Sequence, residues 1–231
     1  MRDIDFIHKL PGIKLVESRE ELILSYCKGK TVLDLGCLGS ALTVQSLHKG
    51  DLLHLKSRQV ASNVVGVDID KNGINFLTDQ GIPNLVRLDV QEIDKLKLDI
   101  PINVILAGEI LEHLENPGLF LKSISKLMSR NESILIITVP NAFSLRNFFS
   151  VLVNRKEMVR SDHKYYFSYV TIKCLLNRYN LRVIGCYAYS NLRRELTPLK
   201  KSMKKLLNRT VLRFSPFLAE GLIVIAGKEK S

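Results

Sequence analysis

Three aspartates, each at the end of an apolar run, have types and spacing that suit a ligand site. Asp34 comes just before the glycine turn in "TVLDLGCLGS", Asp68 ends "NVVGVD", and Asp89 ends "NLVRLD". In an open α/β sheet, ligands bind beyond the carboxyl ends of the strands. A small-residue loop followed by two acids suits adenosine. The loop would take a charged tail, Asp68 the ribose hydroxyls, and Asp89 would face the adenine amine.

The neighbours of these acids are expected to line the same site. The expected lining residues are Gly36, Cys37, Gly39, Ile69, Val90, Gly108 and Glu109. Asp70 is better suited to capping the next helix than to binding a ligand. Cys37 is expected to fill space in the loop rather than to act as a nucleophile.

A second group with possible chemistry follows the fourth apolar run, in "AGEILEH". Glu109, Glu112 and His113 stand at positions i, i+3 and i+4, so a helix beginning there would place all three on one face. We take Glu112, His113 and the later His163 as the catalytic candidates, with either histidine as a general base. The alternatives are a structural role for Glu112 and His113 after the strand, and a surface or lid role for His163.

The elements that must position these residues alternate between strand-like and helix-like patterns. Seven strands are predicted, at 30–36, 63–69, 84–90, 102–108, 133–140, 181–189 and 220–228. The first five are apolar without strict alternation, which is typical of strands buried on both faces of a parallel sheet. Ser18 with Glu21 predicts a capping box, and Asn116 before Pro117 predicts a helix start.

This alternation predicts a doubly wound, Rossmann-like α/β sheet of seven strands with helices on both faces. The sheet is expected to be mostly parallel, with an antiparallel edge from the last two strands. We predict one domain over residues 1–231, with a helical lead-in over 1–29 and a basic helical insertion over 191–218 before the last strand.

Charge is unevenly distributed along the chain. The net charge is +11, and it divides into −2 for residues 1–141 and +13 for residues 142–231. Such asymmetry favours an anionic partner or simply a basic solvated face. The segment 197–214 reads as a basic amphipathic helix, which either lies on an anionic membrane surface or covers the sheet. The charged N-terminus and four cysteines without CxxC spacing predict a cytoplasmic protein, with possible peripheral membrane attachment.

The same motifs resemble those of the class I S-adenosylmethionine-dependent methyltransferases. "VLDLGCLGS" is similar to their first motif, "VVGVDID" to the second and "LDVQEID" to the third. "INVILAGEILEHLENPGLFLKSI" is similar to the fourth and "ILIITVPNAFS" to the fifth. The resemblance is strongest to small-molecule or glycan O-methyltransferases, including the ubiquinone-pathway type. It implies S-adenosylmethionine as the cofactor, and it allows a divalent metal at Glu109, Glu112 and His113, although no metal is assigned.

The first motif departs from the family pattern, because Leu38 and Ser40 stand where glycines are usual. Gly39 offers backbone freedom one residue later, so we predict a rebuilt turn that still holds the cofactor. A nicotinamide site would need glycines at 38 and 41, where the chain has leucine and alanine.

The expected function is methyl transfer to a small-molecule, glycan or lipid-linked acceptor, most simply at an oxygen. Two alternatives remain at this point. One is an RNA methyltransferase, with nucleic acid as the less favoured partner, and the other is a non-catalytic cofactor-binding protein on the same fold.

Overall fold

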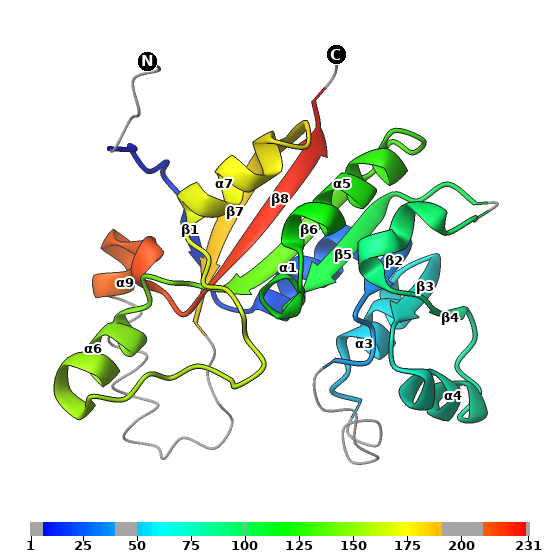
Figure 1. Cartoon of the computed structure of the whole chain (residues 1–231), viewed down its shortest axis with the longest axis horizontal. Helices are drawn as coiled ribbons and strands as arrows, with labels where there is room; N and C mark the ends of the chain where they lie inside the picture. Colours follow the sequence, from blue (N-terminus) through cyan, green and yellow to red (C-terminus); the bar gives the residue numbers. More distant parts are fainter. Residues whose placement is uncertain (1–6, 40–49, 99, 191–209, 230–231) are drawn as a thin grey trace.

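A computed structural model shows one continuous sheet that carries helices on both faces (Figure 1). The structure describes residues 7–39, 50–98, 100–190 and 210–229. The sheet has eight strands in the order β1-β7-β8-β6-β5-β2-β3-β4. Their bounds are β1 Lys14–Val16, β2 Thr31–Leu35, β3 Asn63–Asp68, β4 Leu85–Arg87, β5 Val104–Gly108, β6 Ile134–Pro140, β7 Leu181–Tyr189 and β8 Gly221–Lys228.

The pairing confirms a mostly parallel sheet with one reversed strand. β8 is antiparallel to both of its neighbours, β6 and β7, whereas all the other pairs are parallel. The strand missed in the sequence is β1, which pairs in parallel with β7 and makes the outermost strand on that side. The three residues of β1 are too few to show a period, so this strand has no recognisable pattern in the sequence.

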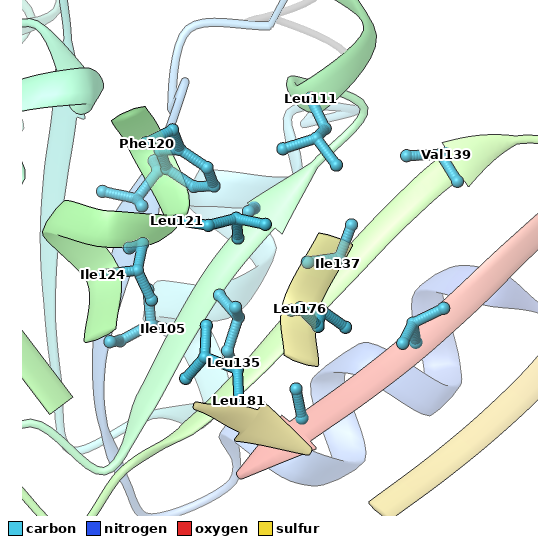
Figure 2. Packing of buried hydrophobic residues seen from close by; sticks show 14 of the residues in the cluster. Ile105, Leu111, Phe120, Leu121, Ile124, Leu135, Ile137, Val139, Leu176 and Leu181 are labelled. Carbon is cyan, nitrogen blue, oxygen red and sulfur yellow. The ribbon is translucent and has the colours of Figure 1, made fainter. Parts of the chain in front are cut away.

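Alternate residues of the strands enter two cores on opposite faces of the sheet. Leu33, Ile105 and Ile137 lie in one core, whereas Val32 and Ile136 lie in the other. This is the period of two expected of a strand, and both faces are covered. Figure 2 shows the first core, where Phe120, Leu121 and Ile124 of one helix pack over buried strand residues.

The helices on that first face are α5 (Pro117–Met128), α7 (Tyr169–Asn177) and the short α9 (Val211–Phe214). The opposite face is covered by α1 (Arg19–Cys27) and α3 (Leu53–Val60), while α4 (Lys71–Asp79) packs against the loop that follows β2. The remaining elements are α6 (Leu145–Asn154), η1 (Val90–Lys95), η2 (Leu111–His113) and η3 (Pro216–Leu218).

Several helix starts follow the predicted capping chemistry. The Ser18 hydroxyl accepts from the Glu21 backbone N–H, which is one of the two bonds of the predicted capping box, and the Asn116 side chain accepts from the Leu119 N–H. Asp70 accepts from the Asn72 N–H at the start of α4, so its predicted role as a cap is confirmed. Each bond satisfies one of the donors that a helix N-terminus leaves unpaired.

Some predicted bounds are wrong. Residues 1–29 are not only helical, because β1 precedes α1. The third predicted strand, 84–90, shrinks to three residues, since Asp89 caps η1 and Val90 already belongs to it. Of the predicted insertion 191–218, residues 191–209 lie outside the described part, and so does most of the predicted helix 197–214. Among the described residues, no helix has the length and apolar content needed to cross a bilayer.

Candidate active site

The loop after β2 turns twice through left-handed backbone. Gly36 has φ +70° and Gly39 has φ +63°, a region that residues with a side chain rarely adopt. The Gly39 N–H donates to the Gly36 carbonyl over 3.1 Å, which closes a tight turn. A Cβ on Gly36 would also lie 2.9 Å from the side chain of Ile110. The two glycines therefore shape this loop, even though the usual glycine at position 38 is absent.

Leu38 does not project into the loop's open side. Its side chain is buried, and a Cβ on Gly73 of α4 would lie 2.4 Å from Leu38 Cδ1. Leu38 instead packs with Cys37, Ile74 and Leu77. Leu38 thus packs the loop against α4. This contact requires glycine at position 73, because any larger residue there would clash with the leucine side chain.

A buried histidine that the sequence analysis missed stands behind the loop. His54 of α3 places its Nδ1 2.9 Å from Asp34 Oδ2, and both side chains are almost completely buried. His54 Nε2 has no hydrogen-bond partner among the described residues. A lone histidine in an amphipathic helix gave no signal of this pairing. This contact fixes the orientation of the Asp34 carboxylate.

The second expected acid is fixed by backbone donors. Asp68 accepts from the Leu38 N–H at 3.2 Å through one oxygen and from the Asp70 N–H at 3.1 Å through the other. The next side chain, Ile69, is exposed. Because each carboxylate oxygen has more than one lone pair, Asp68 can still accept from a ligand.

Asp89 also serves a local cap. It accepts from the Gln91 backbone N–H at 2.9 Å, and the Gln91 side-chain amide lies 3.3 Å from its other oxygen. Val90 beside it is buried. Asp34 lies in β2, Asp68 ends β3 and Asp89 follows β4. These strands are neighbours in the sheet, so the structure places the three acids along one half of its carboxyl edge.

Glu109, which follows β5, lies at the border between the two halves of that edge. Its φ of +54° is left-handed, which is unusual for a residue with a side chain. Its carboxylate accepts from the Tyr189 hydroxyl at 2.7 Å and lies 3.3 Å from Arg19 Nη1. Burial and the nearby Glu109 charge raise the pKa of Tyr189 well above its ordinary value, so its hydroxyl remains a donor. Sequence reasoning missed Arg19 and Tyr189, because they come from α1 and β7.

No α-helix begins at Glu109, the condition under which Glu109, Glu112 and His113 would share one face. The left-handed backbone at Glu109 is followed by a single 3-10 turn, η2, so these three residues do not share a helical face. The structure instead joins Glu112 and His113 to His163. The rings of His113 and His163 are 4.6 Å apart and nearly perpendicular.

Glu112 is fully buried, and among the described residues neither of its carboxylate oxygens has a hydrogen-bond partner. Burial, with a smaller contribution from Glu109, raises its pKa to about 8. Burial and the charge of His113 lower the pKa of His163. His163 is therefore neutral near neutral pH.

A divalent cation would suit this cluster better than the set that the family resemblance allows, Glu109, Glu112 and His113. Glu112, His113 and His163 can each offer one ligand atom, and these atoms lie within 4.8 Å of one another. A buried carboxylate without a hydrogen-bond partner beside two imidazoles is a fitting donor set. Glu109, by contrast, is already bound by Arg19 and Tyr189.

A pocket of about 140 Å³ opens at the other half of the carboxyl edge. It is lined by Glu109, Pro140, Ser144, Arg146, Asn147, Met158, Val159, Arg160, His163, Tyr166, Tyr189 and Glu220. Two of the predicted residues, Glu109 and His163, line it, whereas Glu112 and His113 do not. The edge therefore divides into acidic strand ends on β2, β3 and β4 and a pocket beside β5, β6, β7 and β8.

Comparison with known proteins gives a family match over most of the chain. The model of the family described as "Methyltransferase domain" matches residues 11–185. The chain is 24% identical over 164 residues to the ubiquinone biosynthesis O-methyltransferase of Pelagibacter ubique, covering 67% of this chain and 63% of that protein. It is 28% identical over 121 residues to the pavine N-methyltransferase of Thalictrum flavum, covering 48% of this chain and 31% of that protein. The chain thus spans less than two thirds of the length of these relatives.

Solved structures agree with the fold. An S-adenosylmethionine-dependent methyltransferase from Archaeoglobus fulgidus matches with a TM-score of 0.57 at 22% identity, covering 90% of this chain and 94% of that one. The magnesium protoporphyrin IX methyltransferase of Synechocystis, solved with bound S-adenosylhomocysteine, matches with a TM-score of 0.54 at 14% identity, covering 91% and 82%. Identities this low show a common fold only.

Proposed function

This chain belongs to the class I S-adenosylmethionine-dependent methyltransferases, and we propose that it moves the methyl group of that cofactor to a hydroxyl of a small acceptor held beside His163. The observation that carries this proposal is the divided carboxyl edge. The acidic strand ends offer a cofactor site, and the adjoining pocket holds a neutral imidazole.

On the cofactor side, we assign the ribose hydroxyls to Asp68, which two backbone N–H groups already orient. The exposed Ile69 would pack against the adenine, with Asp89 and Val90 beyond it. The Gly36–Gly39 loop would face the methionine moiety, with Gly108 and Glu109 at the border of the acceptor pocket. Asp34 and Cys37 are buried, so they support the loop from behind.

On the acceptor side, the protein's task is to align the hydroxyl with the S–CH₃ bond and to exclude water. The sulfonium supplies the reactive methyl group. His163 would accept the hydroxyl proton, and His113, whose Nδ1 lies 3.3 Å from Asp162 Oδ2, would hold the His163 ring from its edge. Glu112 is then a positioning residue rather than a base that touches the acceptor. A divalent cation at Glu112, His113 and His163 would be the alternative to this base, since it would occupy the imidazole and supply a Lewis acid for the acceptor oxygen.

The experiment is turnover of S-adenosylmethionine with a panel of phenols, sugars and amines, with and without a chelator. His163→Ala should lower kcat about 100-fold or more, since general bases contribute that much, while cofactor affinity stays unchanged. His8→Ala, at an exposed histidine remote in sequence, is the matched control. Unchanged kcat in folded His163→Ala would refute the base.

Nitrogen is the second candidate acceptor atom, because one relative is an N-methyltransferase. An amine that is already deprotonated needs no base. Methylation of amines alone, with no response to His163→Ala, would therefore favour this alternative over the hydroxyl.

A further inference from the structure

The helix α6 exposes apolar side chains and buries a polar one, which is the reverse of the usual arrangement. Within α6, all of which the structure describes, only Ser150 is buried. Phe148, Leu152 and Val153 are 59%, 63% and 70% exposed. A helix on the surface of a globular protein normally turns its apolar stripe inward and its polar face to water. The apolar stripe of α6 has no cover within the described protein.

The exposed apolar surface extends beyond the helix at both ends. Phe143 precedes it, and Met158 and Val159 follow it, all of them exposed. Figure 1 shows α6 standing clear of the sheet. Single exposed apolar residues are ordinary, but a continuous patch marks an interaction surface.

The charge around this patch indicates what it contacts. Residues 143–160 contain four cations, Arg146, Arg155, Lys156 and Arg160, and a single carboxylate, Glu157. Arg146 is paired with Glu220 and Arg160 with Asp162, so among the described residues the positive charge that remains for a partner lies on Arg155 and Lys156. Arg155 and Lys156 are exposed at the C-terminal end of the helix. A second copy joined through this same patch would bring like charges together, because a twofold interface pairs each surface with itself. An anionic surface would be attracted instead.

We propose that residues 143–160 dock this protein on an anionic lipid bilayer, with the phenylalanine and leucine side chains of α6 inserted among the lipid headgroups. Apolar aromatic and aliphatic side chains flanked by cations are the chemistry of an interfacial helix. The cations add an attraction to anionic lipids that salt screens. This docking does not depend on any catalytic role of the chain.

The docked orientation has a consequence for the acceptor, which rests on the function proposed above. The pocket is lined by residues from both ends of this segment: Ser144, Arg146 and Asn147 near its start, and Met158, Val159 and Arg160 at its C-terminal end. The pocket would therefore open beside the bilayer surface. The acceptor class that fits is a polar hydroxyl group carried on an apolar tail.

The first test uses the absence of tryptophan from the sequence. The variant Phe149→Trp places a single tryptophan, which can be excited selectively over the tyrosines, on the apolar face. With phosphatidylcholine vesicles that contain phosphatidylglycerol, at low salt, its emission should shift to the blue. Brominated lipids should quench it.

The matched control is Ile184→Trp on β7, where the native side chain is also 53% exposed. Its emission should not shift. An unshifted Phe149→Trp spectrum at low salt would overturn the proposal. So would a blue shift that grows with protein concentration in the absence of vesicles, because a second copy would then cover the face.

The second test measures flotation of the full chain with the same vesicles. Phe148→Ser combined with Leu152→Ser should reduce partitioning at least about tenfold, since burying each such side chain is worth about that factor or more. Ile184→Ser should have no effect, and circular dichroism confirms that each variant is folded. Flotation equal to wild type in the folded double variant would overturn the proposal. A positive result here with no turnover of any acceptor would refute the proposed function and leave the docking intact.

Discussion

At the scale of single residues, Asp68 owes its orientation to the backbone and not to another side chain. The Leu38 and Asp70 N–H groups each donate to one of its oxygens, which keeps the carboxylate at the tip of β3. A carboxylate held in this way pays little entropy when a ribose binds to it. Its free lone pairs make charge-assisted hydrogen bonds with the two hydroxyls.

Asp68→Ala should therefore weaken S-adenosylmethionine binding by about 1.5–3 kcal/mol, the range for hydrogen bonds to a charged group. Isothermal titration calorimetry gives the affinity directly. Asp79→Ala, at an exposed carboxylate in α4, serves as the control and should leave the affinity unchanged. Equal affinities in the two folded variants would remove Asp68 from the site.

The residue types were visible in the sequence, but their partners were not. Asp34 could be selected from its place before a glycine turn, yet nothing local indicated that His54 would meet it. Likewise Glu109 was marked by its position after a strand, whereas Arg19 and Tyr189 come from elements 90 and 80 residues away. Pairings of this kind depend on strand order, which periodicity does not encode.

At the scale of elements, the Gly36–Gly39 loop shows how a departure from a motif can be accommodated. The two left-handed glycines make the turn, and Leu38 anchors it against Gly73. The side chain that replaces the usual glycine thus packs away from the ligand side. We therefore expect cofactor binding to tolerate a substitution at position 38 and not at position 39.

Gly39→Val should weaken cofactor binding at least tenfold, because a β-branched residue at φ +63° costs about 1–2 kcal/mol or more and shifts the turn. Leu38→Gly should keep the affinity within a few-fold but lower the melting temperature, since a buried leucine is lost. Calorimetry and thermal unfolding separate the two effects.

Gly81→Val is the matched control, because Gly81 has a similarly left-handed φ of +79° beyond the end of α4. It should cost stability without changing cofactor affinity. The reverse pattern, with Leu38→Gly abolishing binding and Gly39→Val tolerated, would show that the loop is held in another way.

Elements with a strong pattern were predictable, and elements set by a single backbone angle were not. Six of the seven predicted strands were found to within two residues, the exception being 84–90. No helix begins at Glu109 because this residue adopts a left-handed conformation, which no periodicity reveals. Because of this conformation at Glu109, the side chain that lies with Glu112 in the cluster is His163 and not Glu109.

At the scale of the whole molecule, alternating strands and helices predict the layers of the fold but not which strands are neighbours in the sheet. The last strand of the chain lies between β6 and β7, and the first strand closes that side of the sheet beyond β7. The pocket depends on the first of these facts, since Tyr189 ends β7 and Glu220 precedes β8. Sequence order alone could not bring those residues to Glu109.

The buried Glu112 should make the stability of the whole fold depend on pH. Its pKa is about 8 in the folded protein and about 4.5 ordinarily, so between these values the folded state holds a proton that the unfolded state releases. The free energy of unfolding must then fall as pH rises through that window, by at most about 1.4 kcal/mol per pH unit from this one group.

Glu112→Gln should remove this slope, because the amide has no proton to lose. Thermal unfolding in a chelating buffer, from about pH 5 to about pH 8.5, should show the variant nearly equal to wild type at the acid end and more stable at the alkaline end. Glu132→Gln, at an exposed carboxylate, should follow the wild type throughout. If Glu112→Gln and wild type lose stability with the same slope, the carboxyl is already ionised in the folded protein, and the cluster with His113 and His163 must carry a compensating charge.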